Sequence, residues 1–165
     1  MKNTFGKKGW IHIQSGFTLI ELLIVMAIIG VLASLLLTSF IGVRERARDG
    51  RRKSDISQMQ AALEQYRADN ADYPNSSTLS TCGGSLGAGS STYMQKIPCD
   101  PLGTGSGIWN GGVYLYNYIG SGQYSLSFCV ENGSDTDPHI SSSLPSGVTP
   151  SGTCTSGKYY TVYNP

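Results

Sequence analysis

The longest apolar pattern in the chain runs from Leu22 to Val43, a stretch of 22 residues without a charged side chain. About 20 predominantly apolar residues are enough for a helix to cross a bilayer, so this pattern predicts a membrane-spanning helix. The first 16 residues of the chain carry three lysines and no acid. An ordinary secretory signal has an apolar part of only about 7–15 residues, so the length of this run favours an anchor.

A helical pattern of apolar and polar positions follows this run. Four apolar side chains recur at spacings of three and four, with Ala62 beside them: Ile56, Met59, Leu63 and Tyr66. Polar residues fill the other positions: Asp55, Gln58, Glu64 and Arg67. No proline interrupts residues 17–73, and Pro74 stops the pattern, so we predict one continuous helix with one apolar face. We expect a kink at Asp49-Gly50, because glycine weakens a helix interior.

The C-terminal part alternates apolar and polar residues with the period of a β-strand. Val113–Ile119 and Tyr124–Val130 show this pattern on either side of a short glycine-rich turn, which predicts a β-hairpin. Tyr159–Tyr163 is a further predicted strand. A helix followed by short antiparallel strands predicts an α+β fold, in which a long N-terminal helix packs on a small antiparallel sheet.

All four cysteines lie in this C-terminal part, and none forms a Cys-x-x-Cys pair: Cys82, Cys99, Cys129 and Cys154. A zinc site would need closely spaced ligands, which are missing. Two disulfides are the better interpretation, and they indicate an oxidising compartment outside the cytoplasm. Sequence leaves three connectivities open. We favour the sequential one, because each bond then closes a local loop.

An isolated carboxylate lies at the start of the apolar run. Glu21 follows a Gly16-Phe17 junction by four residues, and an acid inside such a helix is costly enough to require a partner. Cutting after Gly16 would supply one, the new α-amino group of Phe17. The order Gly-Phe-Thr-Leu-Ile-Glu resembles the N-terminal signal of type IV pilins and type II secretion pseudopilins. Ile97 to Pro101 also resembles the Ile-Pro-x-Asp-Pro stretch of the major pseudopilins.

The resemblance implies a function and a maturation pathway. A prepilin peptidase would cleave between Gly16 and Phe17 and methylate the new amine. The product would polymerise into a type IV pilus-type filament, with Glu21 paired to the Phe17 amine of a neighbouring subunit. Together with the change in composition after Tyr73, this divides the chain into a leader, a membrane or fibre-core half-helix, an amphipathic half-helix and a β domain: residues 1–16, 17–43, 44–73 and 74–165.

Two alternatives remain open at this stage. The closer one is a subunit of a pseudopilus in type II secretion or DNA uptake. The more distant one is a monomeric, membrane-anchored extracellular binding domain with an uncut leader. Whether the filament is a pilus or a pseudopilus, the expected partners are further copies of this chain, the peptidase, the membrane and the inner-membrane assembly machinery. We expect one membrane pass with the C-terminal domain outside the cytoplasm, although the basic residues after the apolar run would favour the opposite orientation.

Other functions find little support. The net charge of +1 gives no indication of a nucleic-acid partner, and no catalytic motif accompanies His139, so we expect a surface histidine and no enzyme. The basic segment Arg44–Lys53 suggests either binding to anionic headgroups or neighbouring acids, or a solvated helix face.

Calcium is the only cofactor that the resemblance raises. Asp135 and Asp137 lie in the appropriate loop, but their pattern is too incomplete to predict a site, and we expect solvated side chains.

Overall fold

The computed structural model describes residues 16–37, 40–105, 109–120 and 122–164. The chain forms two compact units, residues 1–40 and 41–165, which are considered separately. The first contains helix α1, Leu19–Leu37, whose apolar side chains are exposed. Within the part of the chain that the structure describes, none of the helices combines the length and apolar composition needed to cross a bilayer. The predicted run Leu22–Val43 includes residues 38 and 39, which lie outside the described residues.

The second unit is built on helix α2, Phe40–Asn70. The helix continues without a break through Asp49 and Gly50, the position at which the sequence predicts a kink. It ends before Pro74, because Ala71 adopts a left-handed conformation (φ 62°) and its N–H donates to the carbonyl of Arg67. A residue of this conformation just past the last turn is a common way for a helix to terminate.

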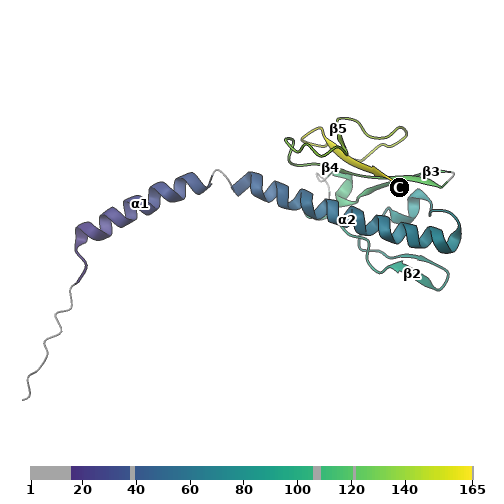
Figure 1. Ribbon diagram of the computed structural model, residues 1–165, viewed down its shortest axis with the longest axis horizontal. Helices are drawn as coiled ribbons and strands as arrows, with labels where there is room; N and C mark the ends of the chain where they lie inside the picture. The colour runs from purple at the N-terminus through teal and green to yellow at the C-terminus, as the bar shows by residue number, and fades with distance from the viewer. Residues whose placement is uncertain (1–15, 38–39, 106–108, 121, 165) are drawn as a thin grey trace, which may run out of the picture. The chain divides into compact units, whose positions relative to one another are not determined.

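Antiparallel strands cover α2, which confirms the predicted α+β fold (Figure 1). The main sheet has the order β3-β4-β6-β5: β3 Leu115–Gly120, β4 Gln123–Cys129, β5 Ile140–Ser141 and β6 Tyr159–Tyr163. The predicted hairpin is β3–β4, with Tyr116 opposite Leu126. A second, two-stranded sheet was not predicted, and it consists of β1, Leu86–Ala88, and β2, Ser91–Met94. Two short 3₁₀ helices complete the unit: η1 Ser76–Leu79 and η2 Trp109–Gly112.

The apolar stripe of α2 faces the core of this unit, as its spacing predicted. Ile56, Met59 and Leu63 are each at most 1% exposed. They meet the alternate residues of β4, including Leu126 and Phe128, which are fully buried. One assignment on the polar face was wrong. Asp55 is buried, and its carboxylate accepts a hydrogen bond of 2.7 Å from the Tyr114 hydroxyl.

The structure joins the cysteines in the sequential arrangement that the sequence analysis favours. Cys82 pairs with Cys99 and Cys129 pairs with Cys154, with Cα–Cα distances of 5.0 and 5.5 Å. The first bond closes the segment around β1 and β2. The second links the end of β4 to the chain that leads into β6. Each therefore limits the freedom of a loop-rich segment in the unfolded chain.

We predict that Cys129→Ala/Cys154→Ala lowers the free energy of unfolding by about 3 kcal/mol, the loss expected for a loop of this length. Cys82→Ala/Cys99→Ala should cost a similar amount, because its loop is only slightly shorter. Urea denaturation of the purified protein, followed by near-UV circular dichroism, measures both losses. Four free thiols in the mass spectrum of the non-reduced parent would contradict this interpretation.

Candidate functional site: the N-terminal junction and a helix–loop ion-pair cluster

The predicted cleavage junction is exposed to solvent in the part of the chain that the structure describes. Gly16 and Phe17 precede the first turn of α1, and Phe17 is 93% exposed. A β-carbon built on Gly16 would meet no atom within 4 Å. The peptide bond between them is therefore accessible to a protease.

Immediately after the junction, Thr18 and Glu21 cap the N-terminus of α1 reciprocally. The Thr18 backbone N–H and hydroxyl donate to Oε2 of Glu21 at 2.9 and 2.8 Å. The Glu21 N–H in turn donates to the Thr18 hydroxyl at 3.3 Å. This is a capping box, which satisfies N–H groups that the first turn leaves without partners. Among the described residues no donor other than Thr18 contacts this carboxylate, so Oε1 is available to a further partner.

A second group of charged residues joins α2 to the loops of the C-terminal unit. We call it the helix–loop cluster. It contains three cations of α2 and five acids: Arg48, Arg52, Lys53, Asp49, Asp100, Glu131, Asp135 and Asp137. Three of the six cations of the basic segment are thus neutralised within the same subunit. Neither interpretation of that segment predicted this pairing.

Arg52 lies at the centre of the helix–loop cluster, with 2% of its side chain exposed. Its Nε and Nη2 donate to the two oxygens of Asp100 at 2.7 and 2.8 Å. Its Nη1 contacts Asp49 at 2.7 Å and Glu131 at 2.6 Å. Burial lowers the pKa of Arg52, but hydrogen bonds and charges from Asp100 and Glu131 outweigh this effect and raise it above the ordinary value.

Asp49 binds the backbone of the loop that follows β4. Its carboxylate accepts hydrogen bonds from the N–H groups of Glu131 (3.1 and 3.2 Å) and Asn132 (2.8 Å). It also accepts the bond from Arg52, so a single buried carboxylate fixes both a helix side chain and a loop. This explains why Asp49 is 2% exposed although it lies in a strongly polar sequence segment.

Lys53 extends the helix–loop cluster to the far end of the same loop. Its Nζ donates to Oδ2 of Asp135 at 2.8 Å and to Oδ2 of Asp137 at 2.9 Å. The hydrogen bond from Lys53 is the main cause that lowers the pKa of Asp137, to about 2. The expectation that these two acids are solvated is therefore wrong. His139 is exposed, as expected, and its ring contacts Asp137.

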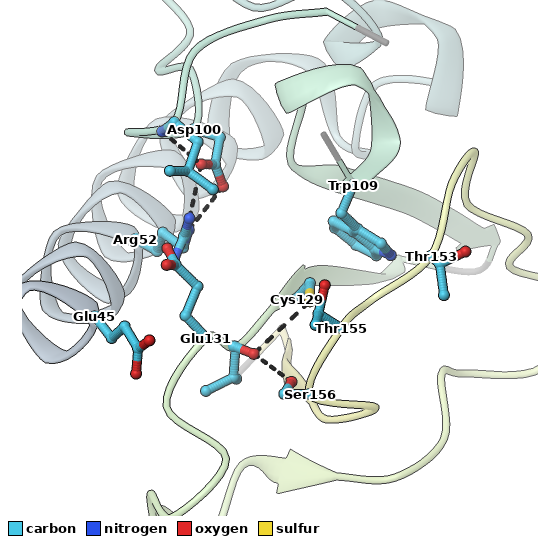
Figure 2. A pocket seen from close by; sticks show the side chains of 11 residues that line it. Glu45, Arg52, Asp100, Trp109, Cys129, Glu131, Thr153, Thr155 and Ser156 are labelled. Atoms are coloured by element: carbon cyan, nitrogen blue, oxygen red, sulfur yellow. Dashed lines mark hydrogen bonds and ion pairs between the residues drawn. The ribbon is translucent and has the colours of Figure 1, made fainter. Parts of the chain in front are cut away.

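A cavity of about 340 Å³ lies beside the helix–loop cluster. Figure 2 shows Arg52 joined to Asp100 at one wall and the indole of Trp109 at another. The indole Nε1 is buried without a hydrogen-bond partner. The acids that line the cavity are held by arginine, except Glu45. In the described part of the chain, no three His, Cys, Asp or Glu side chains are grouped so that they could hold a metal ion.

The capping box could have been read from the sequence, since Thr-x-x-Glu before an apolar run is its signature. The helix–loop cluster could not. Apart from Arg52 and Asp49, which lie three residues apart on α2, its partners are separated by 48 to 84 residues, and no spacing rule links such positions. The only signal was the excess of cations on the helix beside a C-terminal part in which acids outnumber bases.

We predict that Arg52→Met lowers the free energy of unfolding by about 3–5 kcal/mol, because it leaves buried carboxylates without their cation. The neighbouring Arg51 is exposed, so Arg51→Met should change stability by less than about 0.5 kcal/mol. Urea denaturation of both variants measures the difference. Equal losses in the two variants would show that the buried pairs do not hold the fold.

Comparison with known families finds two matches along the chain. Residues 11–37 match the prokaryotic N-terminal methylation motif, which confirms the prepilin-like signal. Residues 39–141 match the type II secretion system (T2SS) protein G model. This second match supports the pseudopilin alternative, in agreement with the Ile-Pro-x-Asp-Pro resemblance.

Similar proteins carry the same description. The type II secretion system core protein G of Pectobacterium carotovorum is 34% identical over 121 residues, which cover 67% of this chain and 75% of that protein. The protein of the same name from Escherichia coli K12 is 32% identical over 66% of this chain and 81% of its own length. The Pseudomonas aeruginosa protein is 32% identical over 77% and 93%. No solved structure matches. Because the protein G model spans more than half of the chain, the chain belongs to the type II secretion protein G family of pseudopilins and is a structural subunit, not an enzyme.

Proposed function

We propose that this chain is a precursor that is cut between Gly16 and Phe17 and then polymerises into the pseudopilus of a type II secretion system. One observation carries the proposal. The exposed Gly16-Phe17 bond is followed at once by a helix whose first turn holds the sole carboxylate of a long apolar segment. This arrangement lies in a chain of the protein G family.

The maturation steps follow from the residues at the junction. Residues 1–16 act as a cytoplasmic leader, and a prepilin peptidase removes them and methylates the Phe17 amine. Residues 17–43 remain in the membrane until assembly, and residues 44–165 lie outside the cytoplasm. The two disulfides support that location, since such bonds persist in oxidising compartments.

Exposed apolar surface on α1 supports assembly by polymerisation. Its large apolar side chains are between 50% and 80% exposed, as in Leu19 and Val25. Such a surface needs a cover, because contiguous apolar patches of this kind mark contacts with lipid or protein. Lipid provides the cover before assembly, and the helices of neighbouring subunits provide it afterwards. The inner-membrane assembly machinery moves the subunit from one environment to the other.

Glu21 sets the position of each subunit in the proposed filament. Its free Oε1 pairs with the Phe17 amine of an adjacent copy. A charge left without its partner in an apolar bundle costs about 3–5 kcal/mol, so a subunit in the wrong axial position is disfavoured. The experiment that tests the whole proposal is N-terminal sequencing of the protein from the membrane. A sequence that begins at Met1 would favour a monomeric anchored domain instead, and detection of long surface fibres would favour a type IV pilus.

We predict that Gly16→Ala, or a bulkier substitution, blocks maturation, because the peptidase needs a small residue for close backbone approach at the scissile bond. Gly30→Ala is a matched control. It makes the same chemical change in α1, where the added methyl group also meets no atom within 4 Å. The intact mass of the membrane-bound protein distinguishes cut from uncut chains. A Gly16→Ala protein with the mature mass would count against the proposal.

We predict that Glu21→Gln is inserted and cleaved but assembles poorly. Glutamine retains an oxygen that can accept from the Thr18 N–H, so the capping box persists while the charge is lost. The variant should accumulate as processed subunit in the membrane with few or no filaments. Glu21→Ala, which loses both the charge and the cap, should behave in the same way.

Electron microscopy of sheared filaments and immunoblots of the membrane fraction measure the two effects. Assembly of Glu21→Gln at the level of the parent would refute the charge pairing. If the variant remained uncleaved, Glu21 would instead serve recognition by the peptidase.

A further inference from the structure

The loop from Glu131 to His139 carries three acids and no lysine or arginine. It is fixed at its start, where the N–H groups of Glu131 and Asn132 donate to Asp49. At its end, the carbonyl of His139 accepts from the N–H of Thr161 in β6. Between these anchors, two carboxylates converge on one point, and they require a positive charge there.

Lys53 supplies that charge from α2. Both Oδ2 atoms lie within 2.9 Å of its Nζ. The ammonium also lies 5.4 Å from the centroid of the Tyr160 ring, which gives it a third favourable contact. Only 26% of the lysine side chain is exposed, and its backbone belongs to a regular helix, so its position is well defined.

The remaining carboxylate oxygens of this loop are also occupied. Oδ1 of Asp135 accepts from the N–H of Asp137 at 3.1 Å. Oδ1 of Asp137 accepts from the N–H of His139 at 3.0 Å. All four oxygens therefore have donors, two from the backbone of the loop and two from Lys53.

This arrangement of carboxylate oxygens does not fit calcium, the ion that the family resemblance raises for this loop. Calcium takes about 6–8 oxygen ligands at 2.3–2.6 Å. Here only two side chains converge, their oxygens face hydrogen-bond donors, and a cation already lies between them. A calcium ion at this point would have to displace the ammonium group and break the hydrogen bonds that shape the loop.

We propose that the ammonium group of Lys53 is the built-in cation of the loop between Glu131 and His139, and that the loop keeps its fold without a divalent metal. The helix thus supplies the positive charge in place of a bound ion. The inference concerns the folded subunit and does not depend on the proposed assembly role.

The first test uses the full-length parent protein in detergent. Thermal unfolding by near-UV circular dichroism should give the same Tm in millimolar calcium chloride and in excess EGTA. Amide hydrogen exchange at Asp137 and His139 should also be the same in the two solutions. A Tm that rises by several degrees with calcium, or exchange that slows at these two amides, would overturn the inference.

The second test removes the cation. Lys53→Met should lower the Tm by several degrees and speed exchange at Asp137 and His139, because two carboxylates then face each other without a positive charge. Lys53→Arg keeps the charge and should retain most of the stability. Lys96→Met is the matched control, since Lys96 is exposed, and it should leave both readouts unchanged.

If Lys53→Met behaves like Lys96→Met, the lysine does not hold the loop and the inference fails. If Lys53→Met does not fold, Lys53→Arg and the calcium comparison on the parent decide the matter. A folded Lys53→Arg protein whose Tm is indifferent to calcium would support the inference, and calcium dependence in either protein would overturn it.

Discussion

The buried guanidinium of Arg52 is the interaction on which the arrangement of the C-terminal unit depends. A charged group with 2% of its side chain exposed must be fully paired to be tolerated. Its partners come from three segments: Asp49 from α2, Asp100 from the loop after β2, and Glu131 from the loop after β4. Since these segments are distant in sequence, one side chain fixes the helix against two loops at once.

The disulfides act on the same segments as the ion pairs. Cys99 directly precedes Asp100, and Cys129 lies two residues before Glu131. Each covalent bond therefore restrains a segment that carries a partner of Arg52. A loop that is already restrained loses less conformational entropy when its carboxylate is fixed.

The sequence predicted what depends on local periodicity. The stripe of Ile56, Met59 and Leu63 and the alternation along β4 each repeat with the period of one element, so burial followed directly. Asp55 is an exception because the hydroxyl of Tyr114, just before β3, donates to it, and a polar position can be buried when it has such a partner. The helix–loop cluster escaped prediction for the same reason, since its pairs join residues that only the tertiary fold brings together.

The capping box leaves the Glu21 carboxylate able to serve both the helix N-terminus and the proposed filament contact. Thr18 holds Oε2 of Glu21 within the subunit, while no donor in the described ranges of the chain contacts Oε1. A carboxylate already ordered by its own helix loses little side-chain entropy when a partner arrives. In the proposed filament, the Phe17 amine of a neighbour would therefore meet an acceptor whose position is set before assembly. The partially positive helix N-terminus further stabilises the carboxylate there. The register of the filament would then be encoded by a residue that first serves to start a helix.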